Sequence, residues 1–336
     1  MTELTLLRYA KLGLRGLGNI LLKKPLSISF EITHSCSANC DHCNWGGRVQ
    51  ETRLTPREYG EICRELKPVI VHLSGGEPLL RKDICDIAAL ISNPEGAPIV
   101  QIVTNGAGLS VEKYKELRRA GVDRFCVSLD FPDNRQDEWR HIPGLFNKLS
   151  NNLPEIGLFK RNDILVNCCI TGANAQVLPD IVRVANSWGV GVNFSSYTSL
   201  RTDDCQYLVR QEGLARALRE SIEEVVSLKR AGYRVLTSDR VLWDHYTFLT
   251  TGNTKRCMSG YRFLVVNPDG RFTPCAMVMK YFRSQEQMVR EFSSTNSCRG
   301  CFICTRADTE KSVKDLIIDN LRFFIQKPEE PRPFEL

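Results

Sequence analysis

Three cysteines near the start of the chain carry the clearest chemistry in this sequence. Cys36, Cys40 and Cys43 have the spacing C-x3-C-x2-C and directly follow an apolar stretch at 26–32. Three thiolates on one short loop can bind three irons of a cubane cluster, whereas the full set for a [4Fe–4S] cluster is four cysteines. One iron is therefore left open, and an open metal position is where catalytic metal sites bind a substrate or a second cofactor.

This cysteine loop resembles that of the radical S-adenosylmethionine (radical SAM) superfamily. The resemblance implies that Cys36, Cys40 and Cys43 are the metal ligands and the catalytic centre, and that the amino acid end of SAM fills the open iron position. The residue before the third cysteine is often aromatic in the superfamily, and here it is His42. We expect this difference to tune the cluster rather than to abolish it.

A glycine-rich segment about thirty residues later fits the same superfamily. Ser74-Gly-Gly-Glu-Pro78 resembles the GGE motif, in which a backbone carbonyl and the glutamate receive the ammonium group of SAM. Glycine suits this place because a side chain would keep the main chain away from the ligand. The resemblance makes Gly75, Gly76, Glu77 and Pro78 cofactor-binding residues.

Polar residues near the ends of the following strands complete the expected SAM site. Asn105 lies in Val-Thr-Asn-Gly at the end of the third strand, and Ser128-Leu-Asp ends the fourth. The segment from Ser128 to Arg140 resembles the SPASM/twitch subgroup, in which the serine and the arginine hold the SAM carboxylate, and an arginine fork suits a carboxylate. Asn167 is a candidate ribose contact. The alternatives are a surface ion pair for Arg140 and a buried, hydrogen-bonded asparagine for Asn167.

The C-terminal part contains a second group of five cysteines, which resembles the beginning of the SPASM/twitch pattern. Four thiolates from a hairpin and a later C-x2-C could hold one auxiliary [4Fe–4S] cluster, and four-thiolate zinc is the competing interpretation. Five exceed the four that one cluster needs, and the sequence does not show which of the last three is spare. The five metal-ligand candidates are Cys257, Cys275, Cys298, Cys301 and Cys304.

Strands and helices alternate through the part of the chain that contains the first motifs. Apolar strands are predicted at 26–32, 69–73, 99–104, 124–129, 164–170 and 190–195, and amphipathic helices at 56–66, 84–93, 111–120, 147–156, 178–188 and 212–231. This alternation predicts parallel βαβ units. The fold class is therefore α/β, a partial (β/α)6 TIM-like barrel with its site at the carboxyl ends of the strands. The resemblance of the later cysteines to the SPASM/twitch pattern implies a small twitch/SPASM-like iron–sulfur domain after it.

We predict four parts in the chain. An amphipathic segment at 1–24 precedes the partial barrel at 25–232, which is followed by the auxiliary-cluster domain at 233–325 and a tail at 326–336. Residues 261–266 and 271–275 flank Asn-Pro-Asp-Gly and should form a hairpin. The basic helix expected within 5–24 could lie on a membrane surface or pack on the barrel floor.

Composition limits the remaining possibilities. The net charge of +6 and the pI of about 8.6 are a weak basic bias. The sequence lacks a Lys/Arg stripe with interleaved aromatic residues, so nucleic-acid binding is not expected. No signal peptide or spanning segment is apparent. Fourteen cysteines without an export signal favour metal ligation in a reducing compartment, so we expect a cytoplasmic protein, with peripheral membrane contact as an option.

The resemblance implies an enzyme, a radical SAM oxidoreductase or transferase that cleaves SAM to a 5′-deoxyadenosyl radical. Only 35 residues precede Cys36, which argues against an added peptide-recognition domain. The chain length, the basic amphipathic start and the C-x2-C-x2-C tail resemble, in layout, radical SAM enzymes of lipid and isoprenoid biosynthesis. We therefore expect a small-molecule or lipid-like substrate, modified at a C–H or C=C bond, with flavodoxin or ferredoxin as electron donor. The alternatives are a peptide-modifying maturase and a non-catalytic iron–sulfur or zinc protein.

Overall fold

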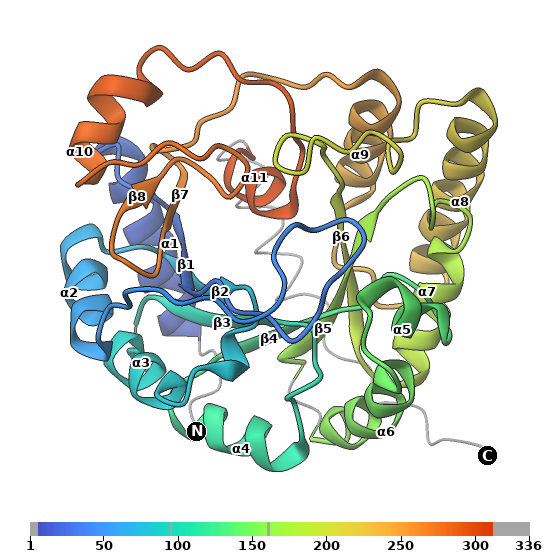
Figure 1. Ribbon diagram of the computed structural model, residues 1–336, viewed down its shortest axis with the longest axis horizontal. Helices are drawn as coiled ribbons and strands as arrows, with labels where there is room; N and C mark the ends of the chain where they lie inside the picture. Colours follow the sequence, from blue (N-terminus) through green and yellow to red (C-terminus); the bar gives the residue numbers. More distant parts are fainter. Residues whose placement is uncertain (1–5, 95, 160–161, 312–336) are drawn as a thin grey trace.

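A single curved sheet forms the centre of the protein (Figure 1). The computed structural model describes residues 6–94, 96–159 and 162–311. Within them the sheet has eight strands in the order β6-β5-β4-β3-β2-β1-β7-β8. The strands are β1 (Ser27–Thr33), β2 (Ile70–Gly75), β3 (Ile99–Thr104), β4 (Arg124–Ser128), β5 (Ile164–Ile170), β6 (Gly191–Ser196), β7 (Phe263–Val266) and β8 (Phe272–Thr273).

Most helices cover the outer side of this sheet, as Figure 1 shows for α2, α3, α4, α6, α7 and α8. The helices up to the end of the barrel are α1 (Leu6–Leu21), α2 (Pro56–Leu66), α3 (Ile84–Ile91), α4 (Val111–Arg119), α5 (Arg135–Arg140), α6 (Leu145–Gly157), α7 (Leu178–Ser187) and α8 (Glu212–Arg230). The C-terminal part adds α9 (Asp239–Thr251), α10 (Gln285–Met288) and α11 (Cys304–Thr309). Two shorter helices are η1 (Pro78–Leu80) and η2 (Val289–Ser293).

The predicted α/β partial barrel is confirmed. Strands β1 to β6 are all parallel and follow one another in spatial order, with helices between them. Alternate residues of each strand face the helices: Phe30, Leu73 and Phe125 belong to the apolar core. The residues between them face the inside of the barrel, because successive side chains of a strand point to opposite sides.

The C-terminal part continues the same sheet. Strand β7 pairs in parallel with β1, where Ser27 lies opposite Phe263, and β8 returns antiparallel to β7 as the predicted hairpin. Asn267 and Gly270 close the turn through a backbone hydrogen bond of 3.0 Å. The boundary predicted at residue 233 stays a prediction, and the sheet continues across it.

Helix α1 packs on the amino ends of the strands, which form the floor of the barrel. Arg8 is buried and its guanidinium contacts both carboxylate oxygens of Asp123, at 2.6 and 2.8 Å. Asn19 donates to the carbonyl oxygens of Pro25 and Lys67. The inner side of α1 is thus held by polar contacts, and its outer side exposes a row of leucines, namely Leu7, Leu14, Leu17 and Leu21.

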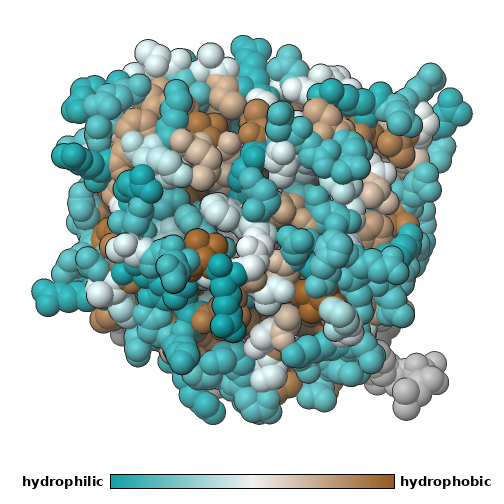
Figure 2. Space-filling view, in the orientation of Figure 1, coloured by the Kyte–Doolittle hydropathy of each residue, from teal (hydrophilic) through white to brown (hydrophobic). Residues whose placement is uncertain are grey.

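Two sequence-based expectations concern the ends of the chain and the membrane. Within the described residues, every helix is too short or too polar to cross a bilayer. The predicted tail at 326–336 and the end of the predicted domain at 233–325 lie outside the described residues. Figure 2 shows that the face turned to the viewer in Figure 1 is mainly hydrophilic, with small apolar areas between polar side chains.

Candidate active site

The loop with the first three cysteines begins immediately after β1 and crosses the mouth of the barrel. Cys36 pairs with Gly47 across the base of the loop, with its N–H 2.8 Å from the Gly47 carbonyl oxygen. Cys43 N–H donates to the Cys40 carbonyl oxygen at 3.0 Å, which makes a tight turn. Cys40 is buried, and Cys36 and Cys43 are partly buried. Burial raises the pKa of Cys36 to about 11, although the Ala38 N–H donates to its sulfur.

Two arginines from distant parts of the chain reach these sulfurs. Arg140 Nη1 lies 3.5 Å from the Cys40 sulfur, and Arg201 Nη2 lies 3.1 Å from the Cys43 sulfur. Positive charge next to a thiol favours its thiolate form, which is the form that binds metal. The sequence did not single out Arg201, which lies in the loop after β6, because nothing in its neighbourhood marks it as a site residue.

Two glycines allow the end of β2 to touch the cysteine loop. A Cβ atom at Gly75, where φ is +126°, would lie 2.1 Å from the Thr33 carbonyl oxygen, and one at Gly76 would lie 2.3 Å from that of Ser35. The backbones are joined there, because Gly76 N–H donates to Thr33 and Glu77 N–H donates to Ser35, at 2.7 and 2.9 Å. Any side chain would separate these two segments.

Glu77 is buried and joins β2 to β3. Its carboxylate accepts from the Thr104 hydroxyl at 2.7 Å, the Asn105 N–H at 2.8 Å and the Leu79 N–H at 3.1 Å. Burial raises its pKa in spite of these bonds. Pro78 begins η1, and Asn105 Nδ2 donates to the Ser37 hydroxyl at 3.1 Å. The predicted role of Glu77 and Asn105 in binding SAM stays a prediction, and what the structure shows is that they fix the strand ends beside the cysteine loop.

Helix α5, which the sequence did not predict, docks on the cysteine loop. Asn39 and Asp41 donate their N–H groups to the carbonyl oxygens of Arg140 and Trp139, both at 3.2 Å. The His42 ring stacks on Trp139 with 5.2 Å between ring centroids. The Arg140 guanidinium also contacts the carboxylate of Asp130, which follows β4. Its predicted contact with the SAM carboxylate stays a prediction.

The remaining predicted SAM residues lie on the neighbouring strands. Ser128, Asn167 and Asn193 are opposite one another on β4, β5 and β6, and Asn193 Nδ2 donates to Asn167 Oδ1 at 3.2 Å. Asp137 has a structural role, because its carboxylate accepts the N–H groups of Gly144 and Phe146 at the start of α6. Ser128 and Asn167 therefore lie at one level of the barrel interior.

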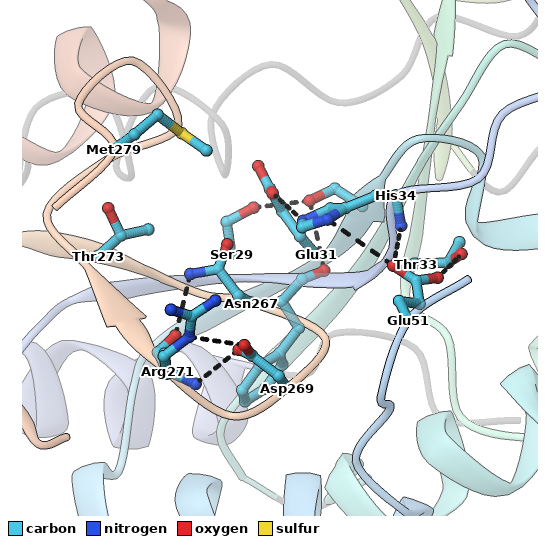
Figure 3. Close-up of polar contacts among 12 residues, drawn as sticks. Ser29, Glu31, Thr33, His34, Glu51, Asn267, Asp269, Arg271, Thr273 and Met279 are labelled. Atoms are coloured by element: carbon cyan, nitrogen blue, oxygen red, sulfur yellow. Dashed lines mark hydrogen bonds and ion pairs between the residues drawn. The ribbon is translucent and has the colours of Figure 1, made fainter. Parts of the chain in front are cut away.

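A charged network holds the other side of the cysteine loop (Figure 3). Glu51 accepts from the Thr33 hydroxyl at 2.6 Å and from the His34 N–H at 2.9 Å, and His34 Nε2 is 3.1 Å from Glu31. Burial opposes ionisation of Glu51, but these hydrogen bonds and Arg53 hold its pKa below its usual range. The network ties β1 to the segment that follows the loop. Figure 3 also shows the hairpin turn nearby, where the Arg271 guanidinium is 2.6 Å from Asp269.

The C-terminal cysteines separate into two groups. Cys257, Cys275 and Cys298 lie in one small apolar cluster, and the thiols of Cys257 and Cys301 are close enough to Cys275 to act on its pKa, which burial raises to about 12. Cys304 lies elsewhere, because its N–H donates to the Ser195 hydroxyl at 3.1 Å. Its thiol is close enough to Cys126 and Cys169 in the barrel wall to contribute to the raised pKa of both.

A cavity of about 150 Å³ lies between the first cysteine loop and the C-terminal part. It is the place where groups from both cysteine regions meet. Among the residues that line it are His42 and Cys43 from the loop, Cys169 and Ser195 from β5 and β6, and Met277 and Ile303 from the C-terminal part.

Comparison with known families agrees with this geometry. Residues 30–153, which contain the cysteine loop, the glycine pair and Arg140, match the Radical SAM superfamily. This part of the chain is a radical SAM domain. Such a domain indicates an enzyme and implies a [4Fe–4S] cluster and SAM as cofactors.

The radical SAM chain is similar to proteins of several named activities. It is 27% identical to the PqqA peptide cyclase of Granulibacter bethesdensis, over 81% of this chain and 73% of the relative. A shorter match, 32% identical over 49% of this chain and 48% of the relative, is to the AdoMet-dependent heme synthase of Methanosarcina barkeri. In fold it resembles Streptococcus suis SuiB bound to the precursor peptide SuiA, with a TM-score of 0.59 and 15% identity, covering 78% of this chain and 63% of SuiB.

These likenesses correct one prediction. The small-molecule or lipid-like substrate expected from the sequence is wrong, because the relatives that match most of the chain are peptide cyclases and SuiB is bound to a precursor peptide. The prediction relied on the 35 residues that precede Cys36. It assumed that a peptide needs an added N-terminal domain, whereas the barrel mouth and the C-terminal part also offer surfaces for one.

The residues around the loop fit a bound cluster and SAM. Four buried nitrogen atoms near the cysteines have no hydrogen-bond partner in the described residues: His42 Nδ1, Trp45 Nε1, Trp139 Nε1 and Arg140 Nε. Sulfides and carboxylates are acceptors that such donors would satisfy. In the described part of the chain, no three His, Cys, Asp or Glu side chains converge on one ion. That is compatible with a cubane, because each of its cysteines binds a different iron.

Proposed function

We propose that this radical SAM enzyme modifies a peptide substrate at an unactivated C–H bond. The observation that carries the proposal is the convergence of the cysteine loop, the Gly75–Gly76 crossing and Arg140 beside a cavity that the C-terminal part closes. The likeness to peptide cyclases supports a peptide as the substrate class. When bound, the cluster and SAM supply a 5′-deoxyadenosyl radical that removes hydrogen from the substrate.

The residues of the chain would bind and orient these groups. Cys36, Cys40 and Cys43 would ligate the cluster, and Arg140 and Arg201 would balance its negative charge, since they contact two of the sulfurs. The backbone at Gly75 and Gly76, together with Ser128 and Asn167, would line the SAM site. His42, which is half-buried and stacked on Trp139, would help to keep water from the radical.

Anaerobic reconstitution tests this function. The wild-type protein with a one-electron reductant should convert SAM to 5′-deoxyadenosine, measured by mass spectrometry, and the Cys36→Ala/Cys40→Ala/Cys43→Ala variant should not. A peptide carrying deuterium at the reacting carbon should pass it to 5′-deoxyadenosine. Continued SAM cleavage by the triple variant would refute the cluster assignment, and transfer from non-peptide metabolites alone would refute the peptide substrate.

We further propose one auxiliary [4Fe–4S] cluster, with Cys304 as the spare cysteine. The ligands would be Cys257, Cys275, Cys298 and Cys301, whose thiols lie in or beside one apolar cluster. Such a cluster would accept an electron from a substrate radical. A flavodoxin or ferredoxin would supply the electron for the first cluster. Four-thiolate zinc is the alternative, and metal analysis separates the two.

Peripheral membrane contact through α1 is a separate proposal. Leu7, Leu14, Leu17 and Leu21 are 65%, 71%, 46% and 82% exposed and follow one side of the helix. Apart from the buried Arg8, residues 4–30 contain Lys11, Arg15, Lys23 and Lys24 and no aspartate or glutamate. An apolar row beside basic residues suits an anionic lipid surface.

A further inference from the structure

A second and larger cavity is separate from the cavity of the proposed active site. It measures about 1370 Å³ and is an open groove between the end of α8, helix α9, the segment 253–256 and the region around α11. Its volume exceeds the roughly 300–1,000 Å³ of typical small-ligand pockets, so the groove is suited to a longer, extended ligand.

The groove is strongly basic. Counted over the residues that the structure describes, its lining includes seven lysines and arginines against three carboxylates, an excess of four positive charges. The carboxylates already have cationic partners: Asp239 is 3.2 Å from Lys229, Asp244 is 3.9 Å from Arg240, and Glu310 is 2.9 Å from Arg306. The groove therefore keeps an excess of positive charge that its own acids do not offset.

Four cations of the groove form no ion pair with a carboxylate in the described part of the chain. They are Arg230, Lys255, Arg256 and Arg299, all of them exposed. Arg256 donates to the carbonyl oxygens of Ser293 and Ser294, whereas no side-chain bond is seen for the other three within the described residues. Cations gathered in a concave site raise the local concentration of an anionic ligand.

The groove adjoins the proposed active site through one short segment. Phe302 lines the groove, and the next residue, Ile303, lines the cavity beside Cys43. The Phe302 ring contacts His245 at 4.9 Å between centroids, and His245 Nδ1 is 2.7 Å from the hydroxyl of Ser196, which also lines that cavity. A ligand in the groove would thus be separated from the reaction cavity by this one segment.

We infer that this groove binds an acidic segment of the peptide substrate and so brings the reacting residue to the cavity; this inference rests on the proposed function. The polar lining, with Ser238, Thr247, Thr251, Asn253 and Thr254, offers partners for a peptide backbone. Among the described residues, Phe302 is the one aromatic residue in the lining, so this part of the chain lacks the stacking surface typical of sites for single-stranded nucleic acid. The chain's own residues 312–336 have five acidic against four basic residues and match the charge poorly.

A fluorescein-labelled oligoglutamate peptide tests the inference. Fluorescence anisotropy with the anaerobically prepared full-length protein should show binding that weakens with salt and that an oligoglutamine peptide does not reproduce. The Arg230→Glu/Lys255→Glu variant should bind about tenfold more weakly or worse, because each change reverses a charge at the groove. The matched control is Lys82→Glu/Arg119→Glu, which reverses two exposed cations elsewhere and should bind within about twofold of wild type.

Other results overturn either the inference or the proposed function on which it rests. Equal losses in both double variants would show non-specific attraction to a basic protein. Tighter binding of an oligothymidylate than of oligoglutamate would make the groove a nucleic-acid site. SAM cleavage distinguishes the two proposals: it should be unchanged in the groove variant, so absent peptide binding with intact cleavage refutes only the groove, and absent cleavage with intact binding refutes only the proposed function.

Discussion

Arg140 and Cys40 are 100 residues apart in sequence, yet Nη1 of the arginine lies 3.5 Å from the cysteine sulfur. The same guanidinium contacts Asp130, whose side chain has no exposed surface. Arg140 therefore connects the end of β4 to the cysteine loop. It therefore helps to position the loop in the protein alone, without a bound cofactor.

Removing this arginine should destabilise the protein even without a cluster. Arg140→Ala leaves Asp130 buried without its partner, and breaking a buried pair costs about 3–5 kcal/mol. Arg135→Ala is the control, because its pair with Asp133 is about half exposed and should contribute about 0–1 kcal/mol. Urea unfolding of the metal-free variants measures both changes, and equal values would contradict the buried link.

The glycine crossing makes a second prediction. Gly75→Ala forces a Cβ to within 2.1 Å of the Thr33 carbonyl oxygen at a φ of +126°, so the loop and β2 must move apart. We expect a loss of at least about 1–3 kcal/mol and weaker SAM binding by calorimetry. Gly13→Ala has no atom within 4 Å of the new Cβ and lies in α1, so it should stabilise by about 0.5–1 kcal/mol. A harmless Gly75→Ala would show that the close approach is unnecessary.

Iron content should distinguish the two groups of C-terminal cysteines. Wild type should hold about eight irons and Cys298→Ser about four, since one of two clusters loses a ligand. Cys304→Ser should keep the wild-type iron content, because its N–H contacts Ser195 and its thiol faces the barrel wall. Zinc in place of the second set of irons, or iron loss in Cys304→Ser, would reject the proposed ligands.

Liposome co-sedimentation tests the outer face of α1. Leu14→Glu/Leu21→Glu should abolish binding to vesicles that contain anionic lipid, because both side chains are more than two-thirds exposed on a basic helix. Leu90→Glu/Leu158→Glu changes two exposed leucines elsewhere, 50% and 70% exposed, and should bind normally. Equal binding by all three proteins would remove the membrane proposal.

Local patterns predicted much of this protein. The alternation of apolar and amphipathic segments identified β1 to β6 and the hairpin, because backbone periodicity is a local property. Long-range contacts were not predictable in this way. Arg201 contacts Cys43, which is 158 residues away in the sequence, and the residues next to Arg201 in the sequence do not indicate this contact.

The same limit applies to individual site residues. Glu77 was recognised from its motif, but only the structure shows its bonds to Thr104 and Asn105. That Cys304 lies apart from the other C-terminal cysteines could be seen only in the structure. The C-x2-C-x2-C spacing gives no reason to distinguish one of its three cysteines from the others. The substrate class was mistaken because chain length alone does not reveal where a peptide binds.

The pairing of β7 with β1 has a consequence for biosynthesis. Strand β1 leaves the ribosome long before β7, so its outer edge is not hydrogen-bonded until residue 263 has been made. Until then that edge is an open template for pairing with other nascent chains. Protein truncated before residue 263 should accordingly accumulate in inclusion bodies, whereas in the untruncated protein β7 covers the outer edge of β1.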